Sequence, residues 1–133
     1  MAADDLTSVE SQFGPKETLE RLIAEVQAKG LTVFARIDHA DGAAAVGMTL
    51  RPTTLVIFGN ARGGTPLMQS SQLIGLDLPL KVLVWQDSGG QTRLTYVDPH
   101  VLVKRYGLPP EVEPMANNLA GALRALTAKA ARE

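Results

Sequence analysis

The chain of 133 residues contains no cysteine. Disulfides, thiolate metal sites and thiol nucleophiles are therefore excluded. Aromatic residues make up only 5% of the chain, which leaves few rings for stacking on nucleobases. The formal net charge is −1, from 13 basic and 14 acidic residues, whereas a nucleic-acid binder needs a basic surface to neutralise phosphates. The composition therefore predicts no nucleic-acid partner.

Long apolar runs are missing as well. No stretch approaches the roughly 18 consecutive apolar residues that a membrane-spanning helix needs. The N-terminus carries Asp4, Asp5 and Glu10 where a signal peptide would place a basic segment and then an apolar one. We therefore expect a cytoplasmic protein with no membrane partner. Residues 1–14 are expected to form a flexible lead-in, and residues 15–133 a single domain.

Hydrophobic periodicity predicts both helices and strands. A helix is expected from Pro15, because four apolar residues follow it at the spacing i, i+3, i+4 and i+7: Leu19, Leu22, Ile23 and Val26. A second helix is expected to begin at Thr65-Pro66, with the threonine as N-cap. A last, alanine-rich helix is expected over about residues 111–132. Strands are expected at residues 31–38, 54–58, 80–86 and 91–97.

Two of these strands, residues 54–58 and 80–86, are apolar on both faces. A sheet with helices on one face alone should show alternation instead. The second face is therefore covered either by the last helix or by another copy of the chain. Of these two interpretations we favour the homodimer.

Several segments together carry a family resemblance. They are Ile37-Asp38-His39, Val56 to Asn60, Gly64-Thr65, Leu76 to Val82, and Tyr106-Gly107. In this order and spacing they resemble the bacterial family called domain of unknown function 302, over about residues 15–107. One departure is Ala61, since the family usually shows proline after Phe-Gly-Asn.

The resemblance implies a two-layer α+β fold. Its sheet would be curved, mainly antiparallel and four-stranded, with helices packed on it, as in proteins that resemble the TATA-binding protein. It also implies a dimer. Strands separated by helices would by themselves have suggested a parallel sheet.

A glycine-rich segment leaves the strand at 54–58 and enters the next helix. Free backbone N–H groups at a helix start attract anions, so we predict a site for a small anionic ligand here. Its residues are Gly59, Asn60, Arg62, Gly63, Gly64 and Thr65. The segment is neither a P-loop nor a G-x-G-x-x-G motif, and a tight turn that merely needs glycine is the simpler interpretation.

His39 is the candidate catalytic residue, with Asp38 and Asp77 as candidate carboxylate partners. Asn60 would line the same rim if the strand ends converge. No metal site is expected, because His100 is the only other histidine and no ligand spacing occurs. The sequence does not identify a cofactor.

Three functional hypotheses follow. The favoured one is a small dimeric module that binds a small anionic ligand or a partner protein. The alternative is an enzyme that uses His39 with a nearby carboxylate as an acid–base pair. A nucleic-acid binder would instead need a basic stripe, such as Arg36, Lys81 and Arg93 aligned on the open face of the sheet.

Overall fold

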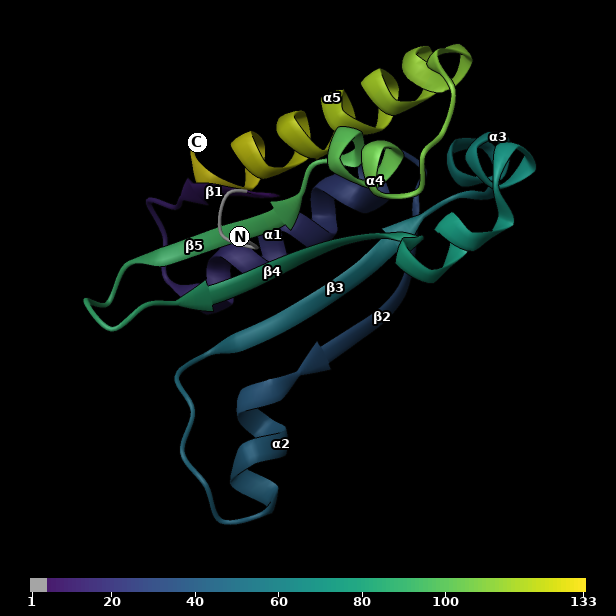
Figure 1. The fold of residues 1–133 in the computed structure, drawn as a ribbon. Helices are drawn as coiled ribbons and strands as arrows, with labels where there is room; N and C mark the ends of the chain where they lie inside the picture. Colours follow the sequence, from purple (N-terminus) through teal and green to yellow (C-terminus); the bar gives the residue numbers. More distant parts are fainter. Residues whose placement is uncertain (1–4) are drawn as a thin grey trace.

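The computed structural model describes residues 5–133 and shows five antiparallel strands in the order β1-β5-β4-β3-β2 (Figure 1). The α+β class and the antiparallel pairing that the family resemblance implied are therefore confirmed. The strands are β1 Leu6–Glu10, β2 Thr32–Asp38, β3 Thr53–Gly59, β4 Leu80–Gln86 and β5 Thr92–Val97.

The expected count of four strands was wrong. The fifth strand, β1, lies inside the segment expected to be a flexible lead-in, and it pairs with β5 from Leu6↔Val97 to Glu10↔Arg93. Val9 on β1 packs against the hydrophobic core. Pairing with the otherwise unpaired edge of β5 therefore orders residues 6–10. Residues 1–4 of the expected lead-in lie outside the described part of the chain.

Between β1 and residue 133, five α-helices and two short 3₁₀ helices connect or flank the strands. They are α1 Pro15–Ala28, α2 His39–Ala45, α3 Ala61–Ser70, α4 Pro99–Arg105 and α5 Glu113–Ala131, with η2 Gln72–Asp77 and η3 Pro110–Val112. The apolar stripe predicted for the first helix is confirmed, since Leu22 and Val26 are fully buried. None of the helices within residues 5–133 has both the length and the apolar character that crossing a membrane requires.

The core lies between the sheet and the pair α1 and α5, which pack on the same face (Figure 1). Its members include Leu22 of α1, Leu123 and Leu126 of α5, and the inward residues Val56 of β3 and Val82 of β4. The last helix therefore covers the inner face of the sheet. The interpretation in which it covers the second face of β3 and β4 is wrong.

The opposite face of the sheet carries no helix among the described residues. Its side chains alternate with the core residues along each strand. On this outer face, Leu55 and Ile57 of β3 lie beside Leu83 and Trp85 of β4, and all four are partly exposed. Both faces of β3 and β4 are thus apolar, and residues 5–133 place helices on the inner one only.

A segment that we call the arm consists of α2 and the loop that follows it, residues 39–52. It extends beyond the sheet from the end where β2 finishes and β3 begins (Figure 1). Val46 and Met48 in its loop are 71% and 66% exposed. Among residues 5–133, the arm is held mainly by contacts of α2 with β3, and the apolar side chains of its loop stay largely exposed.

Candidate functional site

The central strands β4 and β5 diverge toward one end of the sheet. They pair from Leu83↔Thr95 to Gln86↔Thr92. Beyond Leu83, the first residues of β4 pair only with β3, and the last residues of β5 pair only with β1. A cavity of about 300 Å³ lies at this divergence.

The walls of this cavity are mainly aliphatic. Its apolar side chains come from four strands and from α4 and α5, and they are Leu6, Leu55, Leu80, Leu83, Val97, Leu102 and Leu123. The polar lining residues are Asp77, Lys81, Thr95 and Tyr96. An aliphatic chamber with a few polar groups at its edge is the usual design of a small-molecule site.

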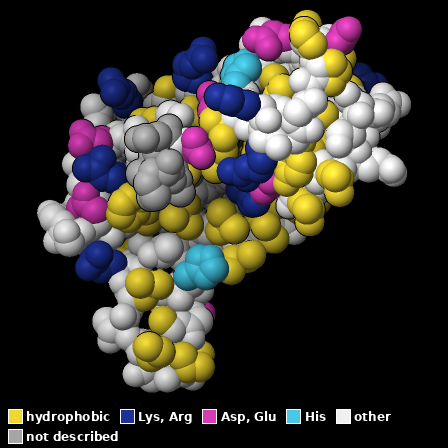
Figure 2. All heavy atoms as spheres, viewed as in Figure 1, with side chains coloured by type: hydrophobic (Ala, Val, Ile, Leu, Met, Phe, Trp, Pro, Cys, Tyr) yellow, Lys and Arg dark blue, Asp and Glu magenta, His cyan; other side chains and the backbone are white. Residues whose placement is uncertain are grey.

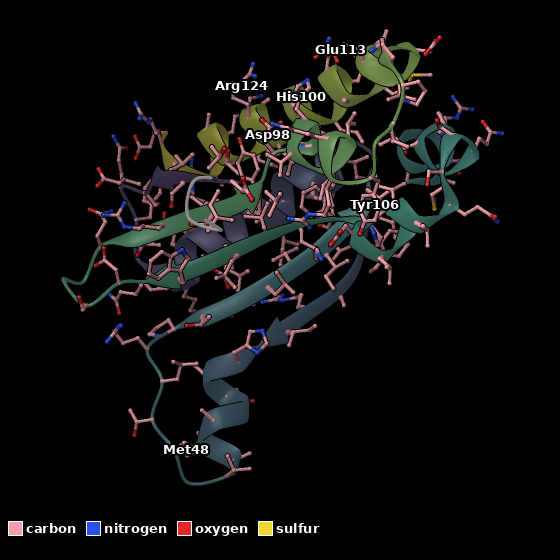
Figure 3. All side chains as sticks on the ribbon, viewed as in Figure 1. Met48, Asp98, His100, Tyr106, Glu113 and Arg124 are labelled. Carbon is pink, nitrogen blue, oxygen red and sulfur yellow. The ribbon has the colours of Figure 1, made fainter. Side chains whose placement is uncertain are left out.

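Asp77 at the edge of the cavity is held by two donors from the end of α4. The Tyr106 hydroxyl donates to Asp77 Oδ2 at 2.5 Å, and Arg105 Nη1 donates to the same oxygen at 3.2 Å (Figure 3). The Tyr106 hydrogen bond, together with Arg105, lowers the pKa of Asp77. The same bond raises the pKa of Tyr106, because it donates to a carboxylate. Asp77 is therefore an ionised residue that ties η2 to α4.

Lys81 differs from Asp77 because its charge is not neutralised by an ion pair. It is exposed at the start of β4, and none of the ion pairs formed by residues 5–133 includes it. The Thr95 hydroxyl already takes part in two hydrogen bonds. Its Oγ1 accepts from Trp85 Nε1 at 2.8 Å and bonds Ser8 Oγ at 2.6 Å. The ammonium of Lys81, whose charge also contributes to the lowered pKa of Asp77, is thus a group with which an anionic ligand in the cavity can pair.

The glycine-rich segment is the first turn of α3 and not a loop. The helix begins at Ala61, with Asn60 as its N-cap, and the expected start at Thr65-Pro66 was wrong. Asn60 Oδ1 accepts from the Gly63 N–H at 2.9 Å. One of the N–H groups that an anion would need is therefore already bonded within the chain.

Packing explains one of the glycines in this turn. A Cβ on Gly63 would lie only 3.0 Å from Leu119 Cδ2 on α5, whereas a Cβ on Gly64 would lie 3.5 Å from Leu78, which is an ordinary contact. Gly59 closes β3 with a φ of 150°, a conformation that side chains disfavour. Arg62 and Thr65 are exposed on the helix surface. The binding of an anion at this segment stays a prediction.

His39 is separated from the other candidate residues. Asp38 pairs with Thr54 at one end of β3, while Thr32 pairs with Gly59 at the other. The two ends lie about 17 Å apart, since each strand residue adds about 3.4 Å. Asn60 and Asp77 therefore share one end of the sheet, and His39 lies at the other.

The immediate neighbour of His39 does not act as its partner either. Asp38 Oδ1 accepts from the Asp41 N–H at 2.8 Å and so serves as the N-cap of α2. Among residues 5–133, no hydrogen bond to the exposed His39 ring is found. Among residues 5–133, no carboxylate is hydrogen-bonded to His39, and its role in an acid–base pair stays a prediction.

A second polar cluster joins α4 to α5 and was not anticipated. The His100 ring places Nδ1 2.7 Å from Asp98 Oδ1 and Nε2 2.6 Å from Asn117 Oδ1 (Figure 3). The contact with Asn117, followed by that with Asp98, raises the pKa of His100. Both ring nitrogens face an acceptor, so the cluster favours the charged imidazole and acts as a clasp between the helices. Asp98 before Pro99 was the one available sequence signal, because it marks an N-cap.

The basic stripe of the nucleic-acid hypothesis does not form. Arg36 lies opposite Val56 and shares the inner face of the sheet, whereas Lys81 lies opposite Ile57 on the outer face. Arg93 is neutralised, with Nε 2.8 Å from Asp87 Oδ2 and Nη2 3.4 Å from Glu10 Oε2. Of these three cations, Lys81 is therefore the one that lies on the open face and forms no ion pair within residues 5–133.

Comparison with known proteins identifies relatives of the chain. The family model described as "Domain of unknown function DUF302" matches residues 7–126. A crystal structure of an uncharacterized conserved DUF302 protein from Bacillus stearothermophilus superposes with a TM-score of 0.85 at 22% identity, covering 95% of this chain and 98% of that one. This likeness concerns the fold alone.

Curated relatives are similar over part of their length. The chain is 47% identical over 103 residues to "Fluoride-specific ion channel FluC 1" of Brucella suis biovar 1 and to "Fluoride-specific ion channel FluC 2" of Brucella melitensis biotype 1. The matched region makes up 77% of this chain but 41% and 38% of those proteins. The chain thus spans about two fifths of the length of the curated relatives that it matches.

Proposed function

The chain belongs to the DUF302 family, and from this premise we propose that it is a non-enzymatic binding module for a small organic anion. The ligand would place its apolar part in the cavity between β4 and β5 and its anionic group beside Lys81. The observation that carries this proposal is an aliphatic chamber with an unpaired ammonium at its edge.

The size and polarity of the cavity define the class of ligand. A volume of about 300 Å³ is at the lower end of the range for ligand pockets, so the ligand is small. Aliphatic walls favour a hydrocarbon part, because burying apolar surface yields roughly 25 cal/mol per Å². A carboxylate fits the head group, since it pairs with an ammonium by a charge-assisted hydrogen bond.

The location differs from the one expected from the sequence, while the chemical class of ligand is the same. The segment Gly59–Thr65 was expected to supply N–H donors, but Asn60 already caps that helix. Lys81 belongs to the quoted family segment Leu76 to Val82, and it supplies the positive charge instead. The enzyme alternative receives no support from the separation of His39 and Asp77.

The names of the curated relatives raise fluoride as a candidate ligand. Fluoride is a compact and strongly hydrated ion, and a bare ion loses far more solvation energy on entering an apolar chamber than one ammonium restores. The cavity in question has mainly aliphatic walls. We therefore propose an organic anion for this site and use fluoride as the contrasting probe.

The test compares hexanoate with hexanamide, its neutral counterpart, and with fluoride. Hexanoate has 8 non-hydrogen atoms, and at about 0.5 kcal/mol per atom it would bind with a Kd of about 1 mM. Binding is measured by ligand-observed NMR and by chemical-shift changes of the cavity residues. We expect hexanoate to bind, and hexanamide and fluoride to bind at least 10-fold more weakly.

The matched variants are Lys81→Met and Lys104→Met. Lys81→Met keeps an unbranched side chain and removes the charge, so the Kd for hexanoate should rise about 10-fold, as expected for the loss of a charge-assisted hydrogen bond. Lys104 is exposed on α4 and is not among the residues that line the cavity, so its variant should bind like the wild type. Equal binding by the wild type and Lys81→Met would refute the proposed site.

A further inference from the structure

The large exposed apolar side chains gather in three places. Within residues 5–133 they lie on the edge strands of the sheet, in the arm and in η2. They are Leu6 on β1, Phe34 and Ile37 on β2 at the opposite edge, Val46, Met48 and Leu50 in the arm, and Leu73 and Leu76 in η2. Single exposed apolar residues need no explanation, but a contiguous set marks an interaction surface. Figure 2 shows hydrophobic side chains along the sheet and on the arm.

The arm and η2 lie at opposite ends of the sheet. The arm joins the end of β2 to the start of β3, and η2 precedes the start of β4. Because Phe58 near the end of β3 pairs with Leu80 at the start of β4, η2 lies at the end of the sheet away from the arm. Between them runs the apolar outer face with Leu55, Ile57, Leu83 and Trp85.

We propose that a second copy of the chain packs its outer face on this one in the antiparallel sense. Each arm would then contact the partner's η2. A two-fold interface must be self-complementary, so that a residue at one end meets a different residue from the other end of the partner. The arm and η2 are exposed apolar elements at opposite ends of the sheet. They meet this condition when the two-fold axis lies in the plane of the interface and runs perpendicular to the strands.

The area of the sheet supports the participation of the arm. Five strands about 4.8 Å apart and six residues long present a face of about 24 by 20 Å, or about 480 Å². A standard interface buries about 800 Å² per partner. The sheet face alone falls short of this value, and the exposed apolar residues of the arm and η2 supply further surface.

The charges on the outer face are compatible with self-association. Arg93 is neutralised by Glu10 and Asp87, so apposing two copies brings no pair of unneutralised arginines together. Lys81 is the one outer-face cation of the described strands that lacks an ion pair. Burial of an unpaired ammonium is unfavourable, and an anion bound in the adjacent cavity would neutralise it. This link between ligand and dimer rests on the proposed function; the packing itself does not.

Cross-linking tests the arrangement, because the chain contains no cysteine and each engineered thiol is unique. Met48→Cys and Leu76→Cys place thiols on the arm and on η2, at side chains that are 66% and 78% exposed in the wild type. The two variants are mixed and treated with a short bismaleimide. We expect Met48→Cys to cross-link to Leu76→Cys at least 5-fold more efficiently than to itself. Preferential cross-linking of Met48→Cys to itself would overturn the antiparallel arrangement.

Sedimentation of the wild type and two substitutions tests the surface itself. The wild type is expected to be a dimer at tens of micromolar, and a monomer at 100 µM would overturn the proposal. Leu83→Glu should shift the chain to monomer, whereas Ala28→Glu, on an exposed position of α1, should leave it dimeric. If Leu83→Glu stays dimeric as well, the interface lies elsewhere and the proposal is overturned.

Lys81→Met separates this proposal from the proposed function. The variant should remain a dimer and bind hexanoate weakly. A wild-type dimer with the expected cross-links but no hexanoate binding would retain the interface and refute the ligand. Hexanoate binding by a wild-type monomer would retain the ligand and refute the interface.

Discussion

Replacing Leu123 by alanine probes whether the cavity reaches the core. Leu123 on α5 is 1% exposed, belongs to the core, and also lines the cavity. Leu126, three residues further on the same helix, is equally buried in the same core but is not a lining residue. The pair therefore compares the same chemical change with and without an adjoining cavity.

The magnitudes follow from what remains after the side chain is removed. Leucine-to-alanine substitutions in cores cost about 2.7–5.0 kcal/mol, and the cost rises by about 24 cal/mol per Å³ of residual cavity. At Leu126 the new space is sealed, so we expect a loss of about 4–5 kcal/mol. At Leu123 the new space joins an existing cavity that water can enter, so we expect about 3 kcal/mol.

Urea denaturation at 25 °C, with all variants at one protein concentration, measures both losses. Unchanged m-values would show that only the free energy of unfolding has moved. A difference of about 1–2 kcal/mol in the expected direction supports a cavity that opens beside Leu123. If Leu123→Ala costs as much as Leu126→Ala or more, the cavity is closed in solution and the reasoning about the ligand site fails.

Three further experiments test the polar clusters and the helix start. Because the pKa of His100 is raised in the folded protein, the charged ring stabilises the fold fully at pH values below its unfolded pKa near 6.5. This stabilisation is lost as the pH rises through the folded pKa. His100→Ala should therefore flatten the dependence of the free energy of unfolding on pH between about 5 and 8. Because the pKa of Asp77 is lowered in the folded protein, its carboxylate stabilises the fold above about pH 3.9, and this stabilisation is lost as the pH falls through the folded pKa. Tyr106→Phe should raise the pKa of Asp77, as measured by NMR titration of the carboxyl group. Gly63→Val should destabilise the fold and Leu119→Ala should relieve part of that loss, as a double-mutant cycle by thermal unfolding would show, because a Cβ at Gly63 meets Leu119. A parallel pH curve for His100→Ala, an unmoved Asp77 or additive losses at Gly63 would contradict the respective assignment.

Elements whose order comes from local signals could be predicted from the sequence. The helix α1 was found because its apolar stripe and Pro15 agree, and the stripe is the face that it buries. The last helix was expected over residues 111–132 and spans Glu113–Ala131. Antiparallel pairing was not contained in the local pattern and came only from the family resemblance.

Elements that depend on distant partners were missed. β1 is a five-residue edge strand with polar residues at Thr7 and Ser8, and its order depends on pairing with β5. The start of α3 was placed late because glycines disfavour a helix, whereas Asn60 caps the turn and Gly63 fits against Leu119 of α5. Tertiary packing overrides local propensity in both segments.

The candidate site shows the same division. Gly59 to Thr65 was predicted to bind an anion because it enters a helix, whereas packing against Leu119 accounts for Gly63. The contact between Asp77 and Tyr106 joins residues 29 positions apart, and no local spacing encodes it. Lys81 became a candidate only when the structure showed the divergence of β4 from β5 beside it.

The apolar second face of β3 and β4 connects the sequence pattern to the proposed interface. The pattern required a cover for both faces, and α5 was one of two candidates for the second. Because Leu123 and Leu126 pack with Leu22 on the inner face, α5 cannot also cover Leu55 and Trp85. No other helix of residues 5–133 lies on that face, so the described residues leave this apolar surface uncovered. A second copy presents both an apolar face and an arm of suitable position, and this reciprocity is the reason that cross-linking from the arm to η2 decides between the candidate arrangements.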